Sequence, residues 1–213
     1  MSFRIAVLIS GKGSNLQALI EELEDAPIEI VGVASSRADA PGLELAEAAR
    51  LETSVFSLAD EPDREKRDAA LAAWLEERDV DLVVLAGFME LLTPGFIRRF
   101  QRRIVNIHPA LLPSFAGLRA IAQALEYGVK IAGVTVHFVD EGMDSGPIIL
   151  QEAFELPYHR GIEAMSEREI EEVEDLFHTV EHRLLPQAVR LIAAGRVSLD
   201  PDNPRFVRVE GDG

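Results

Sequence analysis

Three polar residues at the ends of two predicted strands have the side chains that acyl transfer requires: Asn106, His108 and Asp144. Residues 104–107 read as a short buried strand that ends at His108-Pro109, because proline cannot continue a central ladder. Asp144 follows a second predicted strand at its carboxyl end. Ligands bind at the carboxyl ends of parallel strands in an open α/β sheet, so we expect these side chains to face a crevice.

The chemistry that suits this trio is transfer of an acyl or formyl group to an amine. Attack on a carbonyl places charge on its oxygen, which an amide and an imidazolium each stabilise by about 3 to 4 kcal/mol. A carboxylate beside His108 would orient the imidazole and favour its cationic form. Each residue also has a structural explanation, since Asn106 could cap a turn and Asp144 could be an ordinary turn residue. Their co-occurrence favours catalysis.

A second candidate site follows the first predicted strand. The segment Ser10 to Asn15, SGKGSN, links this apolar strand to a predicted helix. Backbone amides at the start of such a helix, with the Ser14 and Asn15 side chains, suit an anion, and phosphate is the one we expect. Leu16 excludes the dinucleotide fingerprint, and glycine directly after Lys12 excludes a P-loop. A plain strand-to-helix turn is the alternative.

Together these segments resemble the folate-dependent phosphoribosylglycinamide formyltransferases, also called glycinamide ribonucleotide transformylases. The resemblance runs in order from Ile5 to about Gly195, through Leu8 to Ala18, Val84 to Met89, Asn106 to Pro113 and Val136 to Ile148. It implies an enzyme of de novo purine biosynthesis. The implied reaction moves the formyl group of 10-formyltetrahydrofolate to the amine of glycinamide ribonucleotide, giving formylglycinamide ribonucleotide and tetrahydrofolate. Asn106, His108 and Asp144 match the catalytic residues.

The resemblance also implies binding residues. The segment that matches the substrate phosphate site is Gly13, Ser14 and Asn15, and Glu181 matches a carboxylate that accepts hydrogen bonds from the ribose hydroxyls. The folate co-substrate is expected at Arg64, Met89, Glu90, Leu91, Leu92, Asn106, Asp140 and Glu141. Arg64 is expected near its acidic tail, although the charged run 63–68 also reads as a solvated helical face.

The chain departs from the family pattern at three positions. Glu90 stands where a basic residue is common, and Ala116 and Arg119 stand where proline and histidine are usual. If the backbone at position 90 reads the pterin ring, its side chain can vary. None of the three belongs to the expected catalytic trio.

The 213 residues, 47% of them hydrophobic, can form one large domain, and no linker, repeat or low-complexity tract divides them. We expect a formyltransferase domain at 1–200 and an acidic, loosely held C-terminal tail at 201–213. Expected strands lie near 3–9, 28–34, 53–57, 81–86, 103–107, 131–139 and 147–155. Expected helices lie near 15–24, 42–50, 63–79, 94–101, 118–127 and 166–194, the last with a capping box at Ser166 and Glu169. This alternation predicts a Rossmann-like α/β fold with a doubly wound, mainly parallel sheet.

Composition narrows the classes of partner. The net charge of -16, from 37 acidic and 21 basic residues, opposes binding to nucleic acid or a membrane surface. The chain has no cysteine for a disulfide or a zinc-thiolate site, and its first apolar run is too short to span a membrane. We expect a cytoplasmic protein without a metal, whose partners are its two small-molecule substrates. Monomer and homodimer are both compatible with the sequence.

Three other functions stay open. A formyltetrahydrofolate hydrolase would use the same trio with water, but relatives with that activity carry an extra N-terminal domain. A methionyl-transfer-RNA formyltransferase resembles a longer chain with a basic C-terminal domain. A non-catalytic sugar-phosphate or folate sensor could share the scaffold, because fold alone does not give function.

Overall fold

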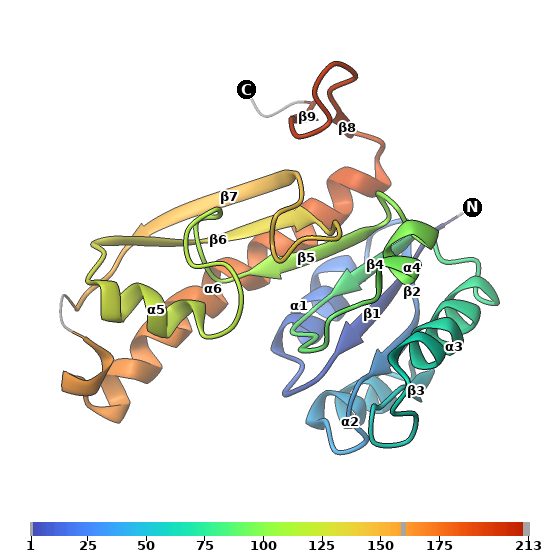
Figure 1. Ribbon diagram of the computed structural model, residues 1–213, viewed down its shortest axis with the longest axis horizontal. Helices are drawn as coiled ribbons and strands as arrows, with labels where there is room; N and C mark the ends of the chain where they lie inside the picture. The colour runs from blue at the N-terminus through green and yellow to red at the C-terminus, as the bar shows by residue number, and fades with distance from the viewer. Residues whose placement is uncertain (1, 159–160, 211–213) are drawn as a thin grey trace. The chain divides into compact units, whose positions relative to one another are not determined.

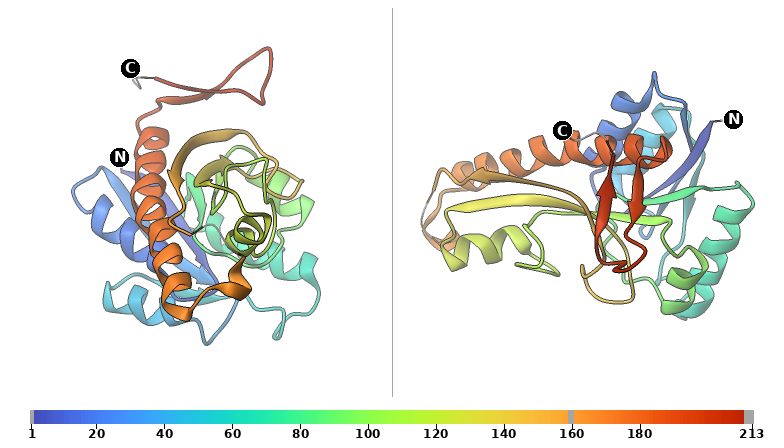
Figure 2. Two further views of the ribbon diagram at one scale, coloured as in Figure 1. Left: turned by 90° about the vertical axis from the view of Figure 1, so that its left-hand side faces the viewer. Right: turned by 90° about the horizontal axis from the view of Figure 1, so that it is seen from above.

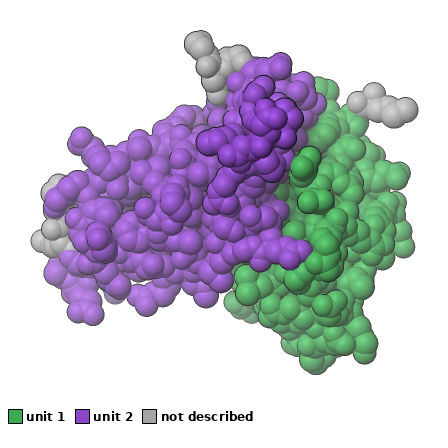
Figure 3. All heavy atoms as spheres, turned by 45° about the horizontal axis from the view of Figure 1, so that its top comes forward, with its two compact units in different colours: residues 1–106 green, residues 107–213 purple. Residues whose placement is uncertain are grey.

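The computed structural model describes residues 2–158 and 161–210, and the chain divides into two compact units, 1–106 and 107–213 (Figures 1 and 3). Unit 1 contains β1 (Phe3–Ile9), α1 (Ser14–Leu23), β2 (Ile28–Ser35), α2 (Pro41–Ala48), β3 (Thr53–Val55), α3 (Arg64–Glu76), β4 (Leu82–Leu85) and α4 (Pro94–Arg99). β5 (Ile104–His108) passes from unit 1 into unit 2. Unit 2 continues with α5 (Ala120–Tyr127), β6 (Ile131–Phe138), β7 (Ile148–Glu155), a 3₁₀ turn (Ile162–Ala164), α6 (Glu167–Ala193), β8 (Val197–Leu199) and β9 (Val207–Val209).

The sheet of unit 1 is parallel throughout, with the strand order β3-β2-β1-β4-β5. From β1 the chain winds outward to β2 and β3, and it then returns to the other side of β1 with β4 and β5. β1 is fully buried from Ile5 to Ile9, as a continuous apolar run predicts for a central parallel strand. Where the winding direction reverses, between β1 and β4, the carboxyl ends of the strands border a ligand crevice in folds of this class.

Unit 2 is built on an antiparallel pair, β6 and β7, with α6 packed along both (Figure 2). The buried residues of α6 recur every three or four positions, which is the spacing of one apolar helix face; they include Val173, Phe177, Val180 and Leu184. The helix begins with the predicted capping box, in which Ser166 and Glu169 each satisfy the other's backbone N–H.

The predicted fold class is confirmed, since the seven strands β1 to β7 make a mixed, mostly parallel sheet whose edge strand β7 is antiparallel. The sequence did not predict the 3₁₀ turn or the pair β8 and β9. The expected tail after residue 200 contains β9, which pairs with β8 from Val207 to Val209, and its residues 211–213 lie outside the described part. β8 and β9 are each three residues long, which is shorter than the run of four to eight residues by which a strand is identified.

Candidate active site

His108 and Asp144 lie together in unit 2. His108 is the last residue of β5 and Asp144 lies in the loop between β6 and β7; His108 Nδ1 is 3.4 Å from Asp144 Oδ2. Both side chains are largely buried, at 7% and 16% exposed. Asn106 lies two positions earlier on the same strand, so its side chain projects from the same strand face as that of His108. The structure thus places an imidazole and a carboxylate in an ion pair at a strand end.

Asp144 is held as a carboxylate. Burial alone would raise its pKa, but three neighbours outweigh that effect: the His137 side chain, the Gly117 backbone N–H and the charge of His108. They lower the pKa of Asp144 from 3.8 to about 2. Gly117 N donates to Asp144 Oδ2 at 2.8 Å, and His137 Nε2 lies 3.7 Å from Asp144 Oδ1. Asp144 is therefore ionised throughout the neutral range and acts as a fixed negative charge.

The loop after β5 contacts the other side of the His108 ring. His108 Nε2 lies 2.9 Å from the Phe115 carbonyl oxygen, which can only accept a hydrogen bond, so Nε2 carries the hydrogen in this arrangement. Phe115 has a left-handed backbone, with φ of 53°, and its ring packs edge-on against Tyr127. Because the same loop provides Gly117 N to Asp144, one segment orients both members of the ion pair.

Two buried polar residues of β6 support this arrangement, and the sequence analysis assigned neither. Thr135 donates to the Ala110 carbonyl oxygen at 2.6 Å and accepts from Leu112 N at 3.2 Å, which fixes the start of the loop. His137 is 2% exposed and faces Asp144. The sequence contains a pattern that could have identified Thr135 and His137: polar residues at alternate positions of an otherwise apolar strand share one face.

The predicted phosphate segment of unit 1 forms the turn from β1 into α1. Gly13 has φ of 81°, and a Cβ there would lie 2.8 Å from Gly42 Cα, so both the backbone angle and the space require glycine. No side chain caps the start of α1, and its first turn contains no acidic residue. Ser14 is partly exposed and Asn15 is buried in that first turn. The geometry suits an anion at the helix N-terminus.

A second segment, Met89 to Leu92, is tied to the same end of the sheet in unit 1. Ser10 N donates to the Gly87 carbonyl oxygen at 3.1 Å, and Met89 N donates to Ser10 Oγ at 2.8 Å. The loops after β1 and β4 therefore meet where the strand order reverses. The side chains of Met89 and Leu91 are exposed, at 67% and 58%, which leaves an apolar surface for a ring.

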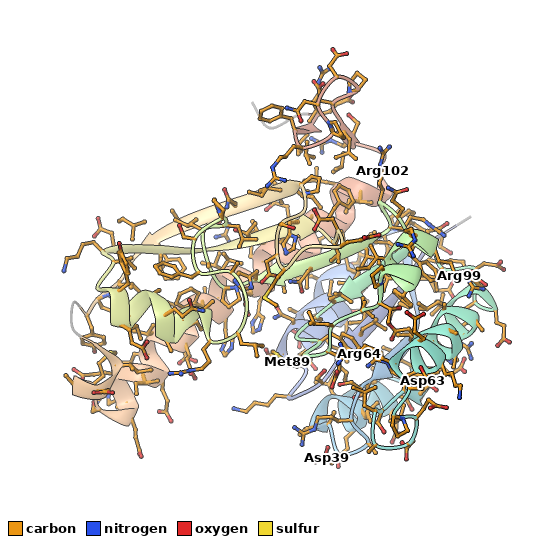
Figure 4. All side chains as sticks on the ribbon, viewed as in Figure 1. Asp39, Asp63, Arg64, Met89, Arg99 and Arg102 are labelled. Carbon is orange, nitrogen blue, oxygen red and sulfur yellow. The ribbon has the colours of Figure 1, made fainter. Side chains whose placement is uncertain are left out.

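Arg64 is the first residue of α3, and Figure 4 labels its side chain and that of Met89. Arg64 Nη1 donates to the Leu91 carbonyl oxygen at 3.2 Å. The expectation of a solvated face for residues 63–68 is wrong at Arg67 and Asp68, which are each 1% exposed and form an ion pair at 2.6 Å. Helical periodicity turns these two toward the interior, while the rest of the run is exposed.

The remaining predicted binding residues lie in unit 2. Asp140 Oδ1 accepts from Gly142 N at 3.0 Å and from Ser145 Oγ at 2.7 Å, so this carboxylate shapes the loop that carries Asp144. Glu141 is exposed in the same loop. Glu181 lies on α6 and is 7% exposed. A nearly buried carboxylate on a helix is unusual unless it has partners.

In residues 2–158 and 161–210, no group of three or more His, Cys, Asp or Glu side chains is arranged to hold a metal ion. Within that same part of the chain, no helix has the length and apolar character needed to cross a membrane.

Comparison with known proteins assigns the chain to a family. Residues 3–189 match the formyl transferase family model. The phosphoribosylglycinamide formyltransferase of Haemophilus influenzae is 40% identical over 198 residues, covering 92% of this chain and 90% of that protein. The crystal structure of glycinamide ribonucleotide transformylase 1 from Symbiobacterium toebii superposes with a TM-score of 0.88 at 44% identity, covering 98% of this chain and 94% of that one.

Some relatives are much longer. The human trifunctional purine biosynthetic protein adenosine-3 is 45% identical over 202 residues, but the chain spans only 19% of its length, and it spans 14% to 20% of comparable trifunctional proteins. The match to proteins of similar length is decisive, because it covers nearly all of both chains. The resemblance inferred from the sequence is confirmed: this chain belongs to the formyl transferase family, among the phosphoribosylglycinamide formyltransferases.

Proposed function

We propose that the chain transfers the formyl group of 10-formyltetrahydrofolate to the amine of glycinamide ribonucleotide, in de novo purine biosynthesis. The observation that carries the proposal is the ion pair of His108 with an ionised Asp144 at the end of a strand. Family membership supports it, because proteins named for this reaction match almost the whole chain.

In the proposed reaction the amine nitrogen attacks the formyl carbon, and the carbon–nitrogen bond to N10 of the folate then breaks. The amine loses one proton and N10 gains one, so the exchange is balanced. Charge collects on the formyl oxygen, where the Asn106 amide and the His108 ring stabilise it. Asp144 keeps its negative charge and holds the ring in its donating form. For His108 Nε2 to reach substrate, it exchanges its contact with the Phe115 carbonyl oxygen for one with the formyl group.

The chain has residues whose chemistry suits the binding of each substrate. For the ribonucleotide, we propose that the backbone and side chains of Gly13, Ser14 and Asn15 bind the phosphate and that Glu181 accepts hydrogen bonds from the ribose. For the folate, we propose backbone contacts along Met89 to Leu92, with Arg64 at the acidic tail and Asn106, Asp140 and Glu141 completing the site. An uncapped helix start and an exposed apolar segment support these assignments.

The proposed chemistry requires no metal, since the side chains provide both the charge stabilisation and the proton transfer. We propose that its partners are the two small molecules, that nucleic acid and membranes are not among them, and that it acts in the cytoplasm. The excess of acidic residues supports this, because it opposes association with polyanions.

The test is a mixing assay of the purified chain with 10-formyltetrahydrofolate, with and without glycinamide ribonucleotide, that follows release of the deformylated folate. We expect turnover only with the ribonucleotide, and a loss of about 10²- to 10⁴-fold in kcat for His108→Ala. Thermal unfolding of the variant controls for loss of fold. Turnover without the ribonucleotide would identify a hydrolase instead, and no turnover with retained ligand binding would identify a sensor.

A further inference from the structure

The side chain of Glu90 lies between two arginines of α3. Its Oε2 is 3.8 Å from Arg64 Nη2 and 3.9 Å from Arg67 Nη1. Both distances are too long for hydrogen bonds, so these contacts are ion pairs without fixed geometry. Glu90 is 29% exposed and Arg64 is 42% exposed, which leaves the pair in contact with solvent. A carboxylate held in this way can be displaced by another anion.

The two arginines differ in how their charges are balanced. Arg67 is 1% exposed and pairs with Asp68 through Nε and Nη2, at 2.7 and 2.6 Å. Its Nη1 is buried and has no hydrogen-bond partner in the part of the chain that the structure describes. Within the described residues, the carboxylate that pairs with Arg64 is that of Glu90, at 3.8 Å. Glu90 is therefore the main counter-charge of Arg64.

Charge at this cluster of four residues sums to zero, because Arg64 and Arg67 are balanced by Asp68 and Glu90. The cluster also touches the proposed folate segment directly. Arg64 Nη1 and Arg67 Nη2 both donate to the Leu91 carbonyl oxygen, at 3.2 and 3.4 Å. A change in charge at Glu90 is thus felt where the acidic tail of the folate is proposed to lie.

We propose that Glu90 sets the charge selectivity of the folate site. A tail carboxylate that pairs with Arg64 must displace Glu90, and each further glutamate on the tail meets a cluster without net positive charge. The protein therefore gains little affinity from a polyglutamyl tail over a monoglutamyl one. This inference rests on the proposed function, because it requires the folate to bind beside Arg64.

The test compares mono- and triglutamyl 10-formyltetrahydrofolate in fluorescence titrations and in turnover, for the wild type, Glu90→Gln and Glu90→Asp. We expect a wild-type affinity ratio near one. Glu90→Gln should raise the preference for the triglutamyl form roughly two- to fivefold, the range for one solvent-exposed ion pair. High salt should remove the gain, because it screens exposed charges. Glu90→Asp keeps the charge and should keep the wild-type ratio of triglutamyl to monoglutamyl affinity.

Glu44→Gln is the matched control, since Glu44 is exposed on α2 and carries the same charge. An unchanged ratio in Glu90→Gln, or an equal rise in Glu44→Gln, would overturn the inference. The binding ratio is read without turnover, so the two proposals fail separately. A shifted ratio without transfer would refute only the proposed function, and transfer with an unshifted ratio would refute only the role of Glu90.

Discussion

The buried pair of Arg67 and Asp68 in unit 1 and the buried pair of His108 and Asp144 in unit 2 are built differently. In unit 1, Asp68 is bonded to Arg67 at 2.6 Å and accepts from Thr93 N, also at 2.6 Å. In unit 2, Asp144 faces two histidines at 3.4 and 3.7 Å and accepts from Gly117 N. The first cluster has a guanidinium at hydrogen-bonding distance from its carboxylate, whereas the second has two imidazole rings at longer distances.

This difference suits the first cluster to a structural role and the second to a catalytic one. The bond from Asp68 to Thr93 holds the residue that caps α4, so the first cluster fixes the segment that follows Met89 to Leu92. A guanidinium does not lose its proton in proteins, so that cluster cannot exchange protons with a substrate. An imidazole can do so, and its looser contacts allow the ring to move toward a reacting atom.

Removing the carboxylate of the unit 1 cluster should destabilise the protein most. Asp68→Ala leaves the Arg67 charge buried without its short-range partner, which costs about 3 to 5 kcal/mol. Urea unfolding monitored by circular dichroism measures the loss. Asp25→Ala, at an exposed position, should stay within about 0.5 kcal/mol of the wild type. A loss below about 1 kcal/mol in Asp68→Ala would mean that the pair is not structural.

Acid should act on the unit 2 cluster. The pKa of Asp144 is about 2 when folded and 3.8 as an isolated group, so its charge contributes about 2 kcal/mol of stability. For a lowered pKa this contribution is complete above about pH 4 and disappears as the pH falls to about 2. The free energy of unfolding, measured from pH 6 to 2, should therefore fall more steeply in the wild type than in Asp144→Asn. Parallel curves would contradict the assignment.

Local pattern was sufficient to predict the fold and much of the candidate site. The apolar run of β1, the turn at Gly13 and the proline after His108 each act within a few residues, so the strand ends could be located. Because parallel strands place their carboxyl ends at one edge, polar residues at those ends were expected at a site. The ion pair of His108 and Asp144 agrees with that reasoning.

Contacts that depend on how helices, strands and loops pack against one another were not predictable in the same way. Arg67 lies in a run of charges that reads as surface, and only the bonds to Asp68 and the Leu91 carbonyl oxygen explain its burial. The position of Glu90 between two arginines likewise depends on how α3 packs against a loop that follows β4. His137 was overlooked because its partner, Asp144, lies beyond the end of its own strand.

Substitution of His137 should have the smallest effect of the three changes to these clusters, because His137 acts through Asp144 and not on the substrate. His137→Leu removes the neighbour that lowers the Asp144 pKa most, so that pKa should rise toward 3.8 while His108 and Gly117 N still hold the carboxylate. We expect kcat/KM to fall about tenfold, equivalent to about 1.4 kcal/mol, with kcat more affected than KM. His137→Gln keeps a donor in the same direction and should recover part of the loss. Carbon NMR titration of the Asp144 carboxyl reads the pKa directly. If it stays at about 2 in His137→Leu, then His108 and the backbone alone hold Asp144 ionised, and the second histidine of the cluster is a packing residue.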